Sequence, residues 1–466
     1  MEQGNFLSQE FVKKTAEEIN IFEKKAPKMC MFVKSMVWDR KSHGLFDYES
    51  KEIARSQFTI QQSGLLVRDD KQIEFKDHWD SVPDEDNSHD DPKLLARVRQ
   101  IGNSEYIVQS RDDPQPLNNR VWLIIRSLKT SAFQNGYIVK PNDVIKIGRV
   151  VLRITELNTE NFSPKLWIDE EFDDIVEIND DCPNPETAWR FCWTSEETED
   201  NPKMCPCFCT GSMKYIHFLC LKQWTDSRKQ LTEEQGVHSI IWKNFDCEIW
   251  KRQYPYVFDF KGRKWNLHDP YRPNDNYNTP YIILESLKND RNSARVVHTL
   301  TATDKKSDYK LGRGHEADVR VINDISVSRL HMSLKFINGN FVLNDWKSKF
   351  GTLVLIRNDL PINWGEHKAI QVGRTIMNFE LKNNGSWCFD EPFKDPCASS
   401  LFENILKSDL NVPNFGVEEE KEDVNLPEQD RIQNLVPHFT VHPNTSVMKG
   451  QLLPPNQYQI DPNSML

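Results

Sequence analysis

The stretch Cys205-Pro-Cys-Phe-Cys-Thr-Gly-Ser-Met-Lys-Tyr-Ile-His-Phe-Leu-Cys220 places four thiols and one imidazole within sixteen residues. One residue separates Cys207 from Cys209, and seven more precede His217, which lies three positions before Cys220. Thiolate and imidazole are the ligands that zinc prefers in tetrahedral protein sites. Inert, buried cysteines are the alternative, because free cysteine packs as a small apolar residue, but burial does not require this spacing. The stretch therefore predicts a small zinc-binding fold.

This spacing resembles the middle of a RING-CH (RING-variant) zinc domain, which has an outer Cys-x-x-Cys pair on each side. Tryptophan replaces one cysteine of each outer pair here. The upstream pair reads Trp189-Arg-Phe-Cys192, and the downstream pair reads Cys247-Glu-Ile-Trp250. The resemblance implies that six of the eight ligand positions remain, namely Cys192, Cys207, Cys209, His217, Cys220 and Cys247.

The cross-braced arrangement of that domain implies two zinc sites that each keep three ligands. The first would hold Cys192, His217 and Cys220, and the second would hold Cys207, Cys209 and Cys247. Structural zinc is almost always closed by four protein ligands. The substitute ligands are Cys182 for the first site and Cys205, His238 or Asp246 for the second.

Two outcomes are expected alternatives for these sites, and a third is disfavoured. One or two zinc ions are retained, or the tryptophans fill the vacated volume and the fold stands on apolar packing alone. An open catalytic zinc is not expected, because no Glu lies at helical spacing from two His ligands. We therefore name no catalytic residue.

Length, charge and cysteine usage restrict the class of protein. A chain of 466 residues suggests about three domains, and the net charge of −11 argues against nucleic acid or an anionic membrane as the main partner. Ten irregularly spaced cysteines favour a reducing compartment. The sequence shows neither a long apolar run nor a basic segment followed by an apolar one, so we expect no membrane span and no secretory signal. The expected location is cytoplasmic, with nuclear or cytoskeletal alternatives.

The N-terminal residues predict a helical arm. Phe11, Thr15, Ile19 and Phe22 recur at steps of three and four, which places them on one face of a helix over residues 8–26. This helix either packs on its own domain or docks on a partner.

Residues 45–160 predict a β-rich module, because β-branched and aromatic residues alternate with turn signals. Its end has an echo later in the chain. The segment 139–149 ends in Ile-Lys-Ile-Gly-Arg, and the segment 364–374 ends in Ile-Gln-Val-Gly-Arg. We interpret the echo as a sign of two related β-sandwiches; chance recurrence in unrelated hairpins is the alternative.

Residues 283–385 carry a second set of motifs. These are Leu311-Gly-Arg-Gly314, Asp318, Ile325-Ser-Val-Ser-Arg-Leu-His331, Leu343-x-Asp345 and Ser348-Lys-Phe-Gly-Thr352. Their order resembles the forkhead-associated (FHA) domain. The resemblance implies a β-sandwich with loops at one end that grip phosphothreonine peptides.

A phosphate dianion requires a guanidinium for paired, charge-assisted hydrogen bonds, together with neutral donors. The resemblance assigns the guanidinium to Arg313 and the neutral donor to Ser328. The expected phosphopeptide-binding residues are Arg313, Ser328, Arg329 and Lys349. The expected structural residues are His331, which supports the loop of Ser328, and Gly312 and Gly351, which permit backbone shapes that a Cβ would hinder.

One position departs from the FHA pattern. The asparagine that usually precedes Gly-Thr is Phe350 here. That asparagine holds the peptide main chain, so its replacement is expected to weaken peptide contacts and to leave the phosphate contacts intact. The alternative is a β-sandwich that serves only as a structural element and recognises no phosphopeptide.

Two segments predict little packed structure of their own. Eight acidic residues lie between Asp169 and Asp181 without a basic one, which indicates an extended, solvated linker or a docking strip for a basic surface. The last 80 or so residues are rich in Pro and Asn and show no periodicity, so composition predicts an extended tail.

The sequence therefore predicts a multidomain, mainly β protein with an FHA-type β-sandwich, a second diverged β-sandwich-like module, a small RING-like α+β zinc domain and extended termini. The predicted parts are an N-terminal helical arm (1–44), a β-rich FHA-like module (45–160), an acidic linker (161–185), a degenerate RING-CH-like domain (186–282), an FHA domain (283–385) and a tail (386–466). This combination resembles a group of proteins abundant in ciliates, which makes a cilium a further expectation for the location.

Two functions from different classes follow. The first is a non-enzymatic scaffold or adaptor in a larger assembly of proteins, which binds a partner, with or without phosphothreonine, through its FHA domain. The second is a RING-CH-type ubiquitin ligase that docks a ubiquitin-conjugating enzyme, with Phe191 and Trp224 as implied contacts. We favour the first, because each zinc site lacks one ligand and metal often supplies much of the folding free energy of such domains.

Overall fold

The computed structural model describes most of the chain between residues 29 and 383. The described residues are 29–38, 45, 47, 53–77, 93–102, 105–111, 115–128, 136–173, 175–178, 196–207, 209–210, 214–242, 246–251, 254–273, 279–287, 294–322 and 324–383. The predicted helix at 8–26 and the predicted tail lie outside these residues, as do Cys182, Trp189, Phe191 and Cys192.

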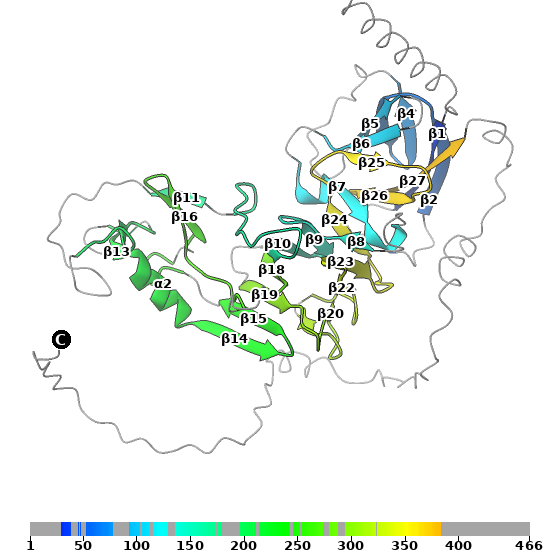
Figure 1. Cartoon of the computed structure of the whole chain (residues 1–466). Helices are drawn as coiled ribbons and strands as arrows, with labels where there is room; N and C mark the ends of the chain where they lie inside the picture. Colours follow the sequence, from blue (N-terminus) through cyan, green and yellow to red (C-terminus); the bar gives the residue numbers. More distant parts are fainter. Residues whose placement is uncertain are drawn as a thin grey trace, which may run out of the picture. The chain divides into compact units, whose positions relative to one another are not determined.

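Ten described strands form a first β-sandwich (Figure 1). They are β1 (Met29–Trp38), β2 (Ile53–Ile60), β3 (Gly64–Asp69), β4 (Gln72–Lys76), β5 (Leu94–Ile101), β6 (Glu105–Gln109), β7 (Val121–Ile124), β25 (Leu360–Ile362), β26 (Lys368–Val372) and β27 (Thr375–Asn383). One sheet has the order β2-β1-β27-β26-β7, and the facing sheet has the order β4-β3-β5-β6-β25. The short 3-10 helices η2 (Leu117–Asn119) and η3 (Ile125–Ser127) flank β7.

Ten more described strands form a second sandwich of the same design. They are β8 (Tyr137–Ile138), β9 (Val144–Ile147), β10 (Val150–Asn158), β18 (Tyr281–Leu287), β19 (Arg295–Thr301), β20 (Asp308–Gly312), β21 (Val319–Arg320), β22 (Met332–Ile337), β23 (Asn340–Asp345) and β24 (Thr352–Leu355). One sheet runs β19-β18-β10-β9-β24, and the facing sheet runs β21-β20-β22-β23-β8.

The two sandwiches exchange their last three strands. The first is built from β1–β7 and receives β25–β27, whereas the second is built from β18–β24 and receives β8–β10. Exchange of identical elements between copies is known as domain swapping, and here it occurs within one chain. The two β-modules that the sequence predicts one after the other are therefore intertwined. Their exact residue boundaries stay a prediction.

The exchanged strands explain why the sequence contains an echo. The Ile-Lys-Ile-Gly-Arg segment forms β9 and the turn into β10, and the Ile-Gln-Val-Gly-Arg segment forms β26 and the turn into β27. Gly148 and Gly373 begin these two-residue turns with φ of 62° and 52°, a region that favours glycine and suits tight hairpins. The two hairpins therefore occupy equivalent places in the two sandwiches.

Both sandwiches share one continuous apolar core. Strands β7, β9 and β26 lie inside the long sheet, and all their residues are buried. Hydrogen bonds between β24 and β7 join the sheets of the two sandwiches. Within the first sandwich, the hydroxyl of Tyr106 donates to the carbonyls of Met29 and Ile60, at 3.1 and 3.3 Å, and so ties the facing sheets together.

The region between β10 and β18 is an insertion into the second sandwich. Its elements are β11 (Ile175–Ile178), β12 (Lys203–Met204), β13 (Ile216–His217), α2 (Phe218–Asp226), β14 (Lys229–Glu234), β15 (Val237–Trp242), β16 (Val257–Phe260) and β17 (Arg263–Asn266). The insertion begins and ends on neighbouring strands, since β10 pairs with β18. Its hairpin β14–β15 extends the same sheet beyond β19. In the described part of the chain, no helix has the length and apolar character needed to cross a membrane.

Apolar residues of the insertion pack on the outer face of that sheet. Phe218, Leu221 and Cys247 belong to one buried cluster together with Ile283 of β18 and Val297 of β19. The insertion and the second sandwich are thus joined by strand pairing and by a common core.

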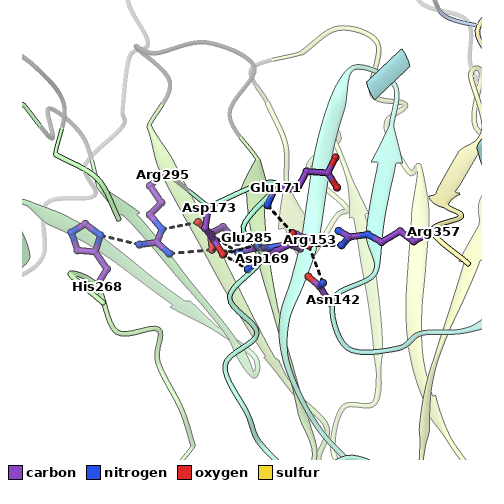
Figure 2. Close-up of polar contacts among 9 residues, drawn as sticks. All are labelled: Asn142, Arg153, Asp169, Glu171, Asp173, His268, Glu285, Arg295 and Arg357. Atoms are coloured by element: carbon purple, nitrogen blue, oxygen red, sulfur yellow. Dashed lines mark hydrogen bonds and ion pairs between the residues drawn. The ribbon is translucent and has the colours of Figure 1, made fainter. Parts of the chain in front are cut away.

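Polar contacts reinforce this attachment (Figure 2). Arg153 of β10 donates two hydrogen bonds to Asp173, at 2.9 and 2.6 Å, and both side chains are almost fully buried. Arg295 of β19 donates to both oxygens of Glu285, at 2.8 and 3.0 Å, and lies 3.1 Å from Nδ1 of His268. The network neutralises two buried guanidinium groups with two carboxylates.

The acidic segment after β10 thus differs from the expected solvated linker. Asp173 is buried against Arg153, and Asp169 accepts hydrogen bonds from Arg357 and from Asn142. Although burial raises the pKa of Asp169, the hydrogen bonds from Arg357 and Asn142 hold it below its usual value. The partners Arg153, Arg357 and Asn142 lie outside the acidic segment, so the charge pattern of that segment could not identify them.

Candidate functional site

Three loops at one end of the second sandwich bring the predicted phosphate-binding residues together. Arg313 follows β20, Ser328 lies between β21 and β22, and Lys349 lies between β23 and β24. The backbone N–H of Arg313 donates to the Ser328 carbonyl at 2.9 Å, and the backbone N–H of Lys349 donates to Ser328 Oγ at 3.0 Å. The side chains of Arg313, Arg329 and Lys349 are exposed. The site therefore presents cations and a positioned hydroxyl to solvent.

Both ring nitrogens of His331, for which a structural role is predicted, contact the backbone of these loops. Its side chain is fully buried, and its Nδ1 accepts the backbone N–H of Ser328 at 3.1 Å. Its Nε2 lies 3.1 Å from the Gly351 carbonyl, which assigns the ring proton to Nε2. Burial lowers the pKa of His331, so the ring is neutral and can accept and donate at the same time.

The two glycines mark close approaches of the backbone. A Cβ at Gly312 would lie 2.0 Å from the Arg329 carbonyl oxygen, which no side chain permits. Gly351 has φ of 77°, a left-handed conformation that favours glycine. Both positions keep the loops of Arg313, Ser328 and Lys349 close together.

Asp345 braces the third loop, a role that the sequence did not assign. Its Oδ1 accepts hydrogen bonds from Ser348 Oγ and Thr352 Oγ1, at 2.6 and 2.7 Å. The spacing Asp-x-x-Ser-x-x-x-Thr was visible in the sequence, but the fold was needed to show that the loop turns back on itself.

Phe350 occupies the position of the missing asparagine and is half-buried. The ammonium of Lys349 lies 5.7 Å from the Phe350 ring centroid and 3.4 Å from a carboxylate oxygen of Asp47. Both charged side chains of that pair are partly solvent-exposed, and such pairs contribute about 0–1 kcal/mol. The ammonium of Lys349 thus remains partly exposed at this end of the sandwich.

A second candidate site lies in the insertion. The sulfurs of Cys207, Cys209 and Cys247 lie within 4.8 Å of one another, and the Cys209–Cys247 separation is 3.5 Å. Zinc–sulfur bonds of about 2.3 Å in a tetrahedron place two sulfurs roughly 3.8 Å apart, so three thiolates here fit a zinc ion. Burial raises the pKa of Cys207 to about 12; the backbone hydrogen bond from Cys209 lowers this pKa, and the neighbouring thiols raise it further. A bound cation reverses that preference, because metal binding deprotonates thiols.

The fourth corner of this site has no protein ligand among the described residues. Trp250, at the eighth ligand position, donates its backbone N–H to Cys247 Sγ at 3.4 Å, while its side chain is 53% exposed. Trp250 therefore does not fill a vacated interior volume. His238, one suggested substitute, instead stacks on Tyr271 with 3.6 Å between ring centroids. The metal-competent group in the described residues contains neither Cys205 nor Asp246.

The first predicted zinc site is described only in part. His217 ends β13 and occupies the N-cap position of α2 without a side-chain capping hydrogen bond, and Cys220 lies on the first turn of that helix. Burial lowers the pKa of His217, which keeps the imidazole neutral, the form that binds metals. Cys192, the third predicted ligand, lies outside the described residues.

Comparisons with known proteins identify two domains in the chain. The family model of the RING-variant domain matches residues 190–241, and that of the FHA domain matches residues 309–377. Mainly β structure with these two domains confirms the predicted combination and fold class. The residues that match the FHA model are divided between the two sandwiches. The loops that carry the motifs belong to the second sandwich, whereas residues 360–377 lie in the first.

Two curated relatives match part of the chain. A 55-residue stretch is 47% identical to ERAD-associated E3 ubiquitin-protein ligase DOA10 of Saccharomyces cerevisiae, and a 46-residue stretch is 39% identical to E3 ubiquitin-protein ligase MARCHF1 of Homo sapiens. These stretches cover 12% and 10% of this chain, but 4% and 16% of the relatives. The similarity therefore concerns one domain.

Proposed function

We propose that this protein is a phosphothreonine-peptide-binding adaptor that joins protein partners in a larger assembly. The observation that carries the proposal is the braced loop of Ser328. Its hydroxyl accepts the Lys349 N–H, its backbone N–H donates to buried His331, and Nε of Arg313 donates to the carbonyl of the neighbouring Val327 at 3.3 Å. A guanidinium and a hydroxyl on one rigid loop suit a phosphate dianion.

The attachment of the insertion supports the adaptor part of the proposal. Strand pairing and the shared core fix the RING-variant region to the sandwich that carries the phosphate site. A partner bound at the loops would therefore be held at a fixed distance from a second partner bound to the insertion. We place the protein in the cytoplasm, with cytoskeletal or ciliary assemblies as the setting that the domain combination suggests.

The adaptor proposal is tested with the full-length protein and a library of phosphothreonine peptides with matched unphosphorylated peptides. Wild type is expected to bind the phosphorylated set selectively. Arg313→Ala removes the charge-assisted contact and is expected to weaken binding at least tenfold. Arg99→Ala, which removes an exposed arginine from the first sandwich, is the matched control. Unchanged affinity in Arg313→Ala would refute the assigned role of the loop.

A ubiquitin ligase is the second candidate, and the relatives favour it. Both matched relatives are named as E3 ubiquitin-protein ligases. The thiols of Cys207, Cys209 and Cys247 lie close enough together to bind one zinc ion. RING ligases orient a conjugating enzyme that carries ubiquitin, and they perform no chemistry of their own. Ligase activity would therefore depend on rigid zinc loops. We propose one zinc ion at Cys207, Cys209 and Cys247, with an exchangeable ligand such as water at the fourth corner.

Two measurements separate the candidates. Elemental analysis is expected to give about one zinc ion per chain at this site, and Cys247→Ser should lower that content. A discharge assay with ubiquitin-charged conjugating enzymes should show no stimulation by the adaptor. Stimulation that Cys247→Ser abolishes would establish the ligase instead.

A further inference from the structure

We propose that strand β14 of the insertion is an interface through which two copies of this chain pair, edge to edge, as an antiparallel dimer. The inference is independent of the proposed phosphopeptide function, because it concerns none of the residues of the phosphate site. A dimer would carry two copies of that site, which raises the avidity for a partner with two phosphothreonines.

Strand β14 is an exposed edge at one end of the twelve-stranded sheet. In the described part of the chain it pairs with β15 alone, and all six of its residues are exposed. An edge strand presents N–H and C=O groups that a further strand can bind. The open side of β14 is therefore a surface for strand addition.

The contacts of β15 fix the direction of the backbone groups in β14. The carbonyl of Gly236 accepts the N–H of Thr301 in β19, at 3.0 Å. Since backbone groups alternate in direction along a strand, the N–H and C=O of Val237 point the opposite way, toward β14. Val237 is paired with Glu234, so the backbone groups of Glu234 point toward β15.

The same alternation leaves three residues of β14 with backbone groups directed at the open edge. Counting back from Glu234, every second residue bonds to β15, and the residues between them point away from it. The outward-facing residues are Lys229, Leu231 and Glu233. Strand β14 can therefore bind a partner strand without losing a hydrogen bond to β15.

A second copy of β14 is complementary to this edge in one antiparallel register. Outward-facing residues must pair with each other, and all three take part when the two-fold axis passes beside Leu231. This register places Lys229 opposite Glu233 of the partner subunit on both sides of the axis. Opposite charges directly across an antiparallel pair stabilise it. Moving the axis to Thr232 would instead set Leu231 against a glutamate.

Leu231 adds an apolar contact to this pairing. Its side chain is 56% exposed, and across the hairpin it is paired with Ile240, which is buried in the apolar cluster of the insertion. Residues paired directly across two strands have their side chains on the same face. A second Leu231 at the two-fold axis therefore extends that cluster and covers a side chain that is exposed in the single chain.

The charged residues of the edge make only long contacts within their own chain. Nζ of Lys229 lies 3.7 Å from Oδ1 of Asp226, and Oε1 of Glu233 lies 3.6 Å from Nε2 of His238. The side chains of Lys229 and Glu233 are 37% and 66% exposed. Such exposed pairs contribute little, so both side chains can turn to the partner strand at small cost.

The experiment is sedimentation velocity of the full-length protein. Interfaces of this size are weak, so we expect wild type to dimerise with a dissociation constant on the order of 10–100 µM. Leu231→Pro removes an outward-facing N–H and none that bonds to β15, and it should abolish the dimer. Melting temperatures confirm that each variant is folded.

Charge reversals test the register. Lys229→Glu and Glu233→Lys each place like charges opposite each other, and each should weaken dimerisation at least about fivefold. An equimolar mixture of these two variants should associate again, because their edges are complementary. Lys71→Glu makes the same charge change in an exposed turn of the first sandwich and is the control.

Three results would overturn the inference. They are a wild type that stays monomeric up to about 300 µM, a dimer that persists in Leu231→Pro, and a mixture of the two charge variants that associates no better than either alone. The affinity of each chain for a phosphothreonine peptide should be unchanged in all these variants, so the adaptor proposal is tested separately.

Discussion

The two exchanged hairpins place the same Gly-Arg turn at equivalent points of two sandwiches, and the two arginines differ completely in their surroundings. Arg374 is 7% exposed and donates to the carbonyls of Trp38 and Asp70, at 3.1 and 2.7 Å. Arg149 is half exposed beside the loop of Ser328. One motif therefore serves as a structural clamp in the first sandwich and is half exposed beside the Ser328 loop in the second.

A second equivalent pair extends the comparison. Five residues after each turn glycine, β10 has Arg153 and β27 has Asn378. Arg153 is buried under the insertion and paired with Asp173, whereas Asn378 makes one long hydrogen bond to the Lys34 carbonyl, at 3.4 Å. The strand therefore sets where each residue lies, and the segments that pack on the sheet set its burial and its hydrogen-bond partners.

The largest expected effect tests the exchange itself. Deleting residues 359–383 removes β25–β27, which the structure places in the first sandwich. Hydrogen exchange should then show lost protection in β1–β6 and retained protection in β18–β23, because the latter keep β8–β10. Loss confined to β18–β23 would show that each sandwich is built from consecutive strands.

Breaking the buried ion pair of the insertion should be the next largest effect. Arg153→Ala leaves Asp173 buried without its bidentate partner, which costs about 3–5 kcal/mol of unfolding free energy. Asn378→Ala, at the equivalent position, should cost less than about 1 kcal/mol. Urea unfolding followed by tryptophan fluorescence compares the two; equal losses would mean that the insertion does not depend on this pair.

Removing the structural clamp should have a smaller effect. Arg374→Ala leaves two buried or partly buried carbonyls without their donor, at a cost of about 2–3 kcal/mol. Arg149→Ala should change stability by no more than about 0.5 kcal/mol. Thermal unfolding of both variants checks this, and a larger loss for Arg149→Ala would contradict the different roles of the two turns.

The sequence predicted motifs well and connections between distant segments poorly. Short-range spacing was enough to identify the loops of Arg313 and Ser328 and the thiols of the insertion. The repeated hairpin pattern indicated two related sandwiches. It could not show which sandwich each hairpin joins, because both hairpins carry the same pattern. The partners of Asp173 and Arg149 lie far away in the sequence, so only the fold reveals them.

The smallest expected effect is a pH dependence that belongs to the second sandwich. Burial lowers the pKa of His331 in the folded state, so at acidic pH the unfolded chain binds a proton that the folded chain does not. Its contribution to stability is therefore complete above an unfolded pKa of about 6.5 and decreases by up to about 1.4 kcal/mol at pH 5.5. His331→Gln, which cannot titrate there, should be less stable at pH 7 but lose less on acidification. An equally steep decline in both proteins would assign the dependence to other groups.

The most direct test is hydrogen exchange of the full-length protein with and without a saturating phosphothreonine peptide. The account predicts new protection in the loops at 313–331 and 348–352, with none at the turn near Arg374. Protection confined to the first sandwich, or unchanged exchange at residues 313–331, would contradict it.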